Sequence, residues 1–392
     1  MASVFGWLDA DEGQRKQMLE VVKLFQDEGS VDELGIGTVR DALANYLFPA
    51  TSVLHTRARY FLFIPWLMRD VARRGLSVEK SLAELRRGEV RLINALLTGG
   101  EQQGVIGSQM RDRLKTMPSS MYWAALGCMG LRIWDVSIDA HFRSTAQRGR
   151  FVSERSTDDD PGRSSSFGFH PDLGDTPQGL LEETTFDLSA DEAEFLRRRL
   201  QTMPGESLYS WMAAHATSAS CQYIWEHPQI ADFPEATRPY VEQGRQFHHI
   251  SFGAPLLYNL MLAELQQSEE LIASYEDEIE QWAGELDAAR VVDQWDAGEF
   301  WTFVRRLNPR IALSTEHFVN RWALLVTNGE HTGARARELV KQRELRLKGR
   351  RSRLVNAEAR QTWTGRSGLV PIDYRWRIAA NHLTDLMNAS DA

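Results

Sequence analysis

The sequence predicts a mainly α-helical protein whose helices pack in two lobes. Two observations lead to this fold class. Apolar residues recur at the three- and four-residue spacing of amphipathic helices along most of the chain, and the apolar–polar alternation of exposed strands is scarce. The chain has 392 residues, 43% hydrophobic and 25% charged, which is the composition of an ordinary globular protein long enough for two domains.

The first part of the chain predicts a series of helices. Ser30 and Glu33 have the spacing of a capping box, which would open a helix after Gly29. Pro65 should bend its helix because proline removes a backbone hydrogen bond. The last helix of the series is apolar on all sides and should be buried. These helices are expected at residues 14–29, 38–48, 53–74, 77–97 (as one or two helices) and 119–134.

The second part of the chain begins after a polar break. Residues 149–185 are rich in Ser, Asp, Gly and Pro, which is typical of a surface loop or linker. Ser189 and Glu192 then form a second capping-box pattern, and helical periodicity returns over residues 207–305. We therefore expect an N-terminal helical lobe at 1–148, a polar linker at 149–185, a second helical lobe with acidic helices at 186–330, and a basic C-terminal segment at 331–392.

The stretch LHTRARYFLFIPW, residues 54–66, places His55, Arg57 and Arg59 before an aromatic block. The apolar run 60–68 has nine residues, whereas a membrane-spanning helix needs about 20. A buried, kinked helix with a small basic lip is therefore predicted. A helix-turn-helix made of residues 38–48, the turn PATS and residues 53–63 stays an alternative, although its turn lacks the usual glycine.

The sequence predicts no cofactor, no metal site and no catalytic residue. The two cysteines, Cys128 and Cys221, do not form a Cys-x-x-Cys pair. Gly35-Ile36-Gly37 lacks the context of a dinucleotide or Walker phosphate loop, and no hydrolase or nuclease motif is present. The N-terminus MASVFGWLDADEG lacks the basic and apolar regions of a signal peptide. We expect a cytoplasmic protein without a membrane partner.

The charge of the chain is unevenly distributed. Residues 331–392 contain 13 Lys or Arg and 6 Asp or Glu, whereas residues 1–330 contain 32 and 48. Residues 332–360 alone hold ten Lys or Arg, and this segment should be helical to about Lys348 and broken at Gly349. Closely spaced cations bind phosphates, and aromatic rings among them can stack on bases. The candidate nucleic-acid-binding residues are Arg335, Arg337, Lys341, Arg343, Arg346, Lys348, Arg350, Arg351, Arg353, Trp363, Arg366, Arg375 and Arg377.

The same charges have an alternative explanation within the protein. Residues 264–299 contain 12 acidic residues and one Arg, so the basic segment could neutralise them. Trp363 and Trp376 would then belong to the core. The sequence leaves both interpretations open, and a plain solvated surface is a third.

Six long blocks of the sequence, in chain order, resemble the bacterial family known as domain of unknown function 6361. The blocks cover nearly the whole chain: WLDADEGQRKQMLEVVKLF, DELGIGTVRDALANYLFPATSVLHTRARYFLFIPW, MPSSMYWAALGCMGLRIW, FDLSADEAEFLRRRL, HISFGAPLLYNLMLAEL and RELRLKGRRSRLVNAEARQTWTGRSGLVPIDYRW. The resemblance implies a place in anti-phage defence loci, beside helicase-like and phospholipase-D-like nuclease proteins. It implies no catalytic residue, since fold and neighbours do not define a site.

Charge distribution and resemblance together predict a non-catalytic subunit of a bacterial anti-phage defence system. It would be a helical scaffold that contacts DNA through its basic C-terminal segment and docks to a helicase or nuclease of the same locus. Two alternatives remain. The first is a metal-dependent nuclease whose site forms only in the fold, and the second is a protein-interaction module that presents the acidic helices.

Overall fold

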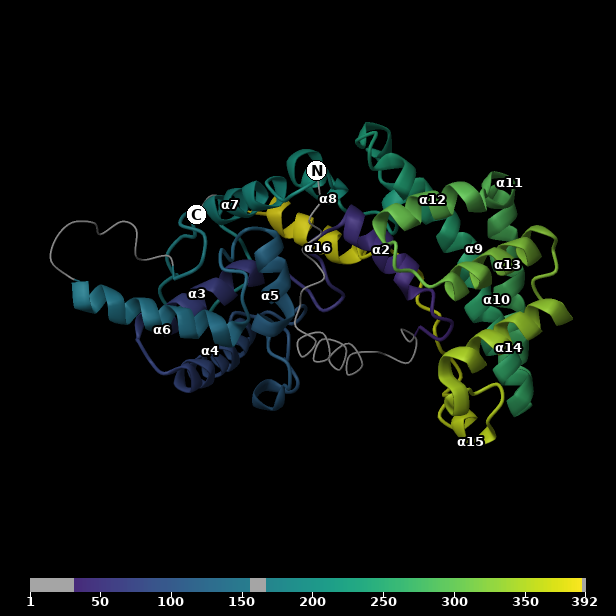
Figure 1. The fold of residues 1–392 in the computed structure, drawn as a ribbon, viewed down its shortest axis with the longest axis horizontal. Helices are drawn as coiled ribbons and strands as arrows, with labels where there is room; N and C mark the ends of the chain where they lie inside the picture. The colour runs from purple at the N-terminus through teal and green to yellow at the C-terminus, as the bar shows by residue number, and fades with distance from the viewer. Residues whose placement is uncertain (1–31, 156–166, 390–392) are drawn as a thin grey trace. The chain divides into compact units, whose positions relative to one another are not determined.

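The computed structural model describes residues 32–155 and 167–389, which form helices α2–α16, short 3-10 turns and no β-strand (Figure 1). The predicted all-α fold class is confirmed. The helix expected at 14–29 and the Ser30 half of the first capping box lie outside the described residues. No helix in the described ranges is both long and apolar enough to cross a membrane.

The chain divides into two compact units. Unit 1 comprises Met1–Leu47 and Glu235–Tyr374, and unit 2 comprises Phe48–Pro234 and Arg375–Ala392. Each unit therefore combines segments from distant parts of the sequence, and the unit bounds differ from the segment bounds expected from chain order. Packing explains the difference. In unit 1, α2 (Gly37–Leu47) packs on α9 (Arg238–Gln266) and α12 (Ala297–Leu307). In unit 2, α16 (Trp376–Met387) packs on α7 (Ala190–Gln201) and α8 (Leu208–His215).

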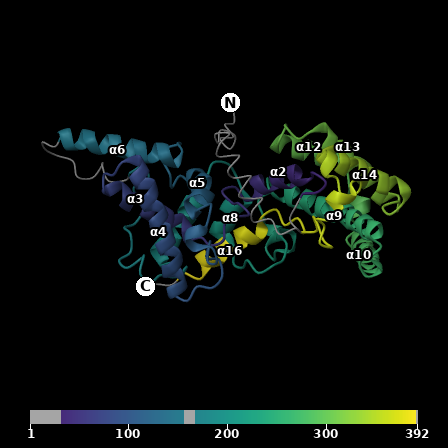
Figure 2. The ribbon, with the colours of Figure 1, turned by 90° about the horizontal axis from the view of Figure 1, so that it is seen from below.

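Unit 1 is built around the long helix α9 (Arg238–Gln266), which buries apolar residues along most of its length. Figure 2 shows α12, α13 and α14 on one side of α9 and α10 on the other. Gly253 of α9 allows close packing with α10, because a Cβ there would lie 2.2 Å from the Trp282 ring. The other helices of unit 1 are α10 (Glu269–Ala288), α11 (Val291–Gln294), α12 (Ala297–Leu307), α13 (Leu313–Thr327), α14 (Ala334–Lys348) and α15 (Ala357–Arg360).

Unit 2 has its core around α3, which packs against α4, α5 and α6. The helix α6 extends into the polar segment predicted as a loop from residue 149, whereas the described residues 167–185 form turns and coil, as expected. The final helix α16 was not predicted from the sequence. The helices of unit 2 are α3 (Tyr60–Arg73), α4 (Val78–Thr98), α5 (Pro118–Cys128), α6 (Ile138–Arg155), α7 (Ala190–Gln201), α8 (Leu208–His215) and α16.

The aromatic stretch at 60–66 is the buried helix that its length and composition predict. Residues Tyr60 to Trp66 are all buried, and Pro65 lies inside α3. The helix begins at Tyr60, because residues 53–59 form turns and coil. The helix-turn-helix alternative, which needs a helix over 53–63, is therefore not formed.

The expected basic lip before α3 is used within unit 2. Arg57 forms an ion pair with Asp385 (2.8 Å), Arg59 pairs with Glu192 (2.9 Å), and His55 is buried. Glu192 also completes the predicted capping box, in which its carboxylate accepts from the Ser189 backbone N–H and the Ser189 hydroxyl accepts from the Glu192 backbone N–H. The two arginines stabilise unit 2 and do not form a separate basic surface.

Candidate nucleic-acid interface

The predicted basic helix is α14, and it ends where the sequence indicates. Its buried positions Ala336, Val340 and Glu344 recur every four residues, so one stripe of the helix faces α9 and α13 while the other faces solvent. Gly349 ends the helix with φ +55, a conformation that favours glycine. Arg346 and Lys348 lie in the last turn, where positive charge complements the helix dipole.

Glu344, in the middle of the basic segment, is fully buried and organises the chain that follows. Its Oε1 accepts hydrogen bonds from the Tyr258 hydroxyl (2.9 Å) and the Arg353 backbone N–H (2.8 Å). Its Oε2 accepts from the Ser352 hydroxyl (2.6 Å) and the Leu354 backbone N–H (3.1 Å). Burial and then the Glu344 charge raise the pKa of Tyr258, so the phenol stays protonated and donates. One carboxylate thus fixes the turn after α14.

A second buried carboxylate, Glu33, lies beside the first and binds two cations of the basic segment. Arg353 Nη1 is 3.1 Å from Glu33 Oε1, and Lys348 Nζ contacts Glu33 Oε2. The Ser367 hydroxyl also donates to Glu33 Oε1 (2.6 Å). We call Glu33, Glu344, Tyr258 and their partners Lys348, Ser352, Arg353 and Ser367 the carboxylate network. Lys348 and Arg353 therefore stay bound to Glu33, because separating such a buried ion pair leaves an unpaired buried charge.

Trp363 belongs to the core of unit 1. Its side chain is 4% exposed, and its indole N–H donates to Asn259 Oδ1 (3.0 Å), which also accepts from the Ser367 backbone N–H (2.8 Å). The ring therefore has no face available for a base, and we remove Trp363 from the candidate interface.

Arg343 is also an internal residue. It is 5% exposed, and its guanidinium donates to the backbone carbonyls of Leu34 (2.7 Å), Gly35 (3.1 Å) and Ser314 (3.0 Å). Gly35 has φ +66, and a Cβ there would lie 2.8 Å from Arg343 Nη2. Gly35 thus allows the backbone turn and the approach of Arg343, whereas a Cβ at Gly37, the first residue of α2, would lie 2.7 Å from the Asp32 carboxylate. Both glycines are accounted for without a phosphate loop.

Three further cations pair with carboxylates at the surface of unit 1. Arg337 contacts Glu264 (2.5 Å) and Arg366 contacts Glu278 (3.3 Å), so part of the basic segment does neutralise the acidic stretch 264–299. Arg335, with a side chain 82% exposed, lies 3.5 Å from Glu330. Arg337 is half-buried, whereas the pairs of the exposed Arg335 and Arg366 contribute little stability and are weakened by salt, so a polyanion can compete for them.

Arg375 and Arg377 lie in unit 2, whereas the other candidate residues lie in unit 1. Arg375 has φ +65 and donates to the Thr51 backbone carbonyl (2.9 Å), whereas Arg377 is exposed on α16. Trp376 between them is fully buried and donates its indole N–H to the Cys221 carbonyl (3.0 Å). These residues therefore do not belong to the unit that contains α14.

Three arginines at the end of α14 and in the following turn remain exposed. Arg346, Arg350 and Arg351, which we call the arginine cluster, form no ion pair with another residue of the described ranges. Arg346 and Arg350 are four residues apart, and Arg351 follows directly in the 3-10 turn Gly349–Arg351. The half-buried Lys341 likewise has no ion pair among the described residues. These permanent charges could contact phosphate oxygens.

Sequence reasoning missed the carboxylate network. The helical phase of α14 carried a signal for it, because Glu344 is in register with Ala336 and Val340 and should face the core. Glu33 could not be found in this way, because its partners lie more than 300 residues further along the chain. Within the described part of the chain, no group of three or more His, Cys, Asp or Glu side chains is placed to hold a metal ion.

The fold and the site together define an all-α protein of two helical units, each built from segments distant in the sequence, with a basic helix anchored by buried carboxylates. The comparison with known families identifies it further. The chain belongs to the family of unknown function DUF6361, which matches residues 2–390. No curated protein and no solved structure matches it.

Proposed function

We propose that the protein is a non-catalytic subunit of a bacterial anti-phage defence system that contacts the phosphate backbone of DNA through the arginine cluster. The observation that carries the proposal is that Arg346, Arg350 and Arg351 stay exposed beside a network that binds the neighbouring cations Lys348 and Arg353. The defence setting rests on what the family resemblance implies, a place beside helicase-like and phospholipase-D-like nuclease proteins.

The anchoring of the cluster supports binding to phosphates. The backbone of residues 353 and 354 is bound to Glu344, and the Asn356 side chain donates to the Arg350 carbonyl (2.9 Å). A fixed backbone lowers the cost of ordering this segment when it binds a polyanion, because only the side chains of the three arginines remain to be ordered. The tryptophans of the basic segment, Trp363 and Trp376, are buried, so the expected contact is to the backbone of nucleic acid and is insensitive to base sequence.

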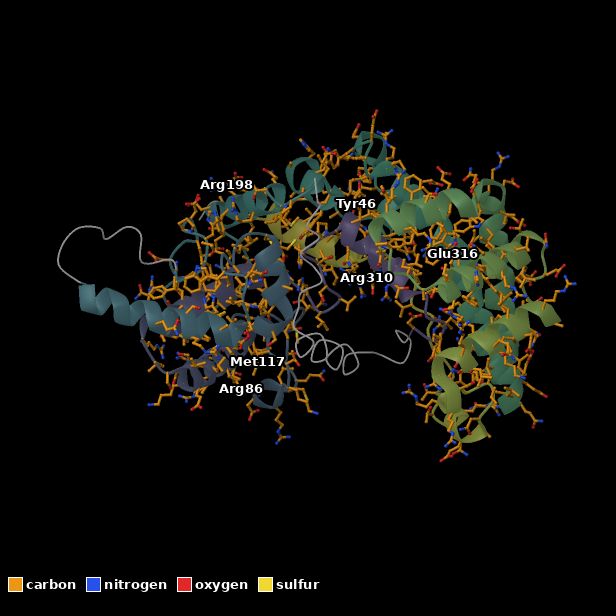
Figure 3. All side chains as sticks on the ribbon, in the orientation of Figure 1. Tyr46, Arg86, Met117, Arg198, Arg310 and Glu316 are labelled. Atoms are coloured by element: carbon orange, nitrogen blue, oxygen red, sulfur yellow. The ribbon has the colours of Figure 1, made fainter. Side chains whose placement is uncertain are left out.

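The test is DNA binding by the full chain, measured by fluorescence anisotropy. Arg346→Glu with Arg350→Glu and Arg351→Glu should lower the slope of log affinity against log salt by about 2–3, since each phosphate contact contributes roughly 0.9. The matched control carries the same charge change on three other exposed arginines of unit 1, Arg306→Glu, Arg310→Glu and Arg321→Glu (Arg310 is labelled in Figure 3). Equal losses in both variants would show that only net charge matters and would refute the proposed site.

A second candidate function is a protein-interaction module, and the exposed acidic face of α10 favours it. Glu276, Asp277, Glu280 and Asp287 are exposed, and among the described acidic residues of this helix only Glu278 forms an ion pair with another described residue. Such a face fits a basic partner protein. Co-purification of a protein encoded in the same locus, retained after nuclease treatment and lost in a Glu276→Lys with Glu280→Lys variant, would favour this function over DNA contact.

A further inference from the structure

We infer that unit 2 carries a second nucleic-acid-binding surface at residues 110–115, formed by three cations around an exposed methionine. We call this segment the 110–115 turn. The inference goes beyond the proposed function, because it concerns the other unit and does not require the arginine cluster to bind.

The 110–115 turn is anchored to α4 on one side. Arg86 of α4 (labelled in Figure 3) donates from Nη2 to the backbone carbonyls of both Asp112 and Leu114, each at 2.8 Å. Leu114 is 4% exposed, and a Cβ at Gly107 would lie 2.6 Å from its Cδ2 atom. One arginine and one buried leucine therefore fix the turn on the helix.

The backbone of the turn is held in a conformation that arginine rarely adopts. Arg111 has φ +45, in the left-handed region that costs an L-residue about 1–2 kcal/mol. Its N–H donates to the Gly107 carbonyl (2.7 Å), and its carbonyl accepts from the Leu114 N–H (3.1 Å). A strained backbone at an exposed position persists only where its surroundings hold it. The backbone that carries the exposed side chains of the turn is therefore preorganised.

The exposed side chains of the turn are mostly cationic. Arg111, Arg113 and Lys115 are exposed, and none of them forms an ion pair with another residue of the two described ranges. Asp112 is the one carboxylate inside the turn. Met110, at the start of the turn, has 54% of its surface exposed. A net positive turn with one apolar side chain is the result.

This chemistry fits nucleic acid better than a lipid surface. Interfacial membrane binding relies on a continuous apolar face, whereas this turn exposes a single large apolar side chain. Three closely spaced cations match consecutive phosphates, and their binding is driven by the release of condensed counterions. An exposed methionine among them can contact sugars or enter a base step, as apolar side chains of groove-binding proteins do.

The test uses the full chain with a short labelled duplex DNA and a single strand of equal length, titrated between about 50 and 200 mM KCl. Arg111→Glu with Arg113→Glu and Lys115→Glu should weaken binding on the order of 10²-fold or more and lower the salt slope by about 2–3. The control variant carries the same charge change elsewhere in unit 2, at the exposed residues Lys80→Glu, Arg143→Glu and Arg198→Glu. Circular dichroism should show equal thermal unfolding for both variants.

The arginine-cluster variant, measured in parallel, separates this inference from the proposed function. Loss of binding in that variant alone would overturn the second surface and leave the first. Loss in the 110–115 variant alone would support the second surface and overturn the first. Binding of the wild-type chain to anionic phosphatidylserine vesicles but not to either nucleic acid, abolished by the 110–115 substitutions, would assign the turn to membranes and overturn the inference.

Discussion

Replacing Glu344 with glutamine tests the carboxylate network that anchors the basic helix. Glutamine keeps the size of the side chain, but one of its two terminal groups is an N–H donor. The buried carboxylate accepts four hydrogen bonds, two at each oxygen. In the variant, the two donors at one oxygen position would face an NH₂ group. Each buried donor without an acceptor costs about 1–3 kcal/mol, so the loss of two acceptors should lower the free energy of unfolding of unit 1 by about 2–6 kcal/mol.

The assay is urea unfolding followed by tryptophan fluorescence, together with thermal unfolding by calorimetry. For a unit of 150–250 residues, 1 kcal/mol shifts the melting temperature by about 2–4 °C, so a decrease of roughly 4–24 °C is expected for the transition of unit 1. Glu338→Gln is the matched control, because Glu338 lies on the same helix and is exposed. Its effect should stay within about 0.5 kcal/mol. Equal stability of both variants would refute the role assigned to Glu344.

Two further substitutions test other buried groups. Burial raises the pKa of Glu89 to about 7, although its Oε1 accepts from the Ser119 N–H (2.7 Å). Because the folded pKa lies above the unfolded value, the contribution of Glu89 to stability is complete below about pH 4.5 and is lost as the pH rises to about 7. Glu89→Gln should remove this pH dependence. The stability of the variant relative to wild type should then rise by up to about 1.4 kcal/mol per pH unit between about pH 4.5 and 7 and stay constant above pH 7, as measured by urea unfolding across pH. A stability difference that does not change with pH would contradict the raised pKa. Trp363→Phe should lower the free energy of unfolding by about 1–3 kcal/mol, because the Asn259 side chain loses one hydrogen-bond donor and the core loses volume. DNA affinity should stay unchanged. Weaker DNA binding by the folded variant would return Trp363 to the interface.

Local sequence patterns predicted much of the secondary structure. The periodicity of apolar residues placed α2, α4 and α14 within a few residues of their observed bounds, and Gly349 was identified as the end of α14. These features depend on the chain within a few turns of a helix. The start of α3 was predicted too early, because residues 53–59 have apolar and basic side chains in a helical pattern but form turns and coil instead.

The candidate site could be predicted only in part. Residue type alone made Arg343, Arg353 and Arg350 equivalent, whereas the structure gives each a different environment. Arg343 binds carbonyls, Arg353 binds Glu33, and Arg350 is exposed. The helical phase of α14 distinguishes Arg343, but the pairing of Arg353 depends on a carboxylate 320 residues earlier in the chain. Contacts of this kind arise from tertiary packing and leave no local signal.

The most direct test of the account compares two double variants with the same loss of charge. Arg350→Gln with Arg351→Gln should lower the salt slope of DNA affinity by about 2 and leave unfolding unchanged. Lys348→Gln with Arg353→Gln should lower the stability of unit 1 by several kcal/mol, because Glu33 loses both of its cations, while the folded protein keeps the wild-type slope. Equal salt slopes for the two variants would contradict the division of the basic segment into structural and DNA-contacting residues.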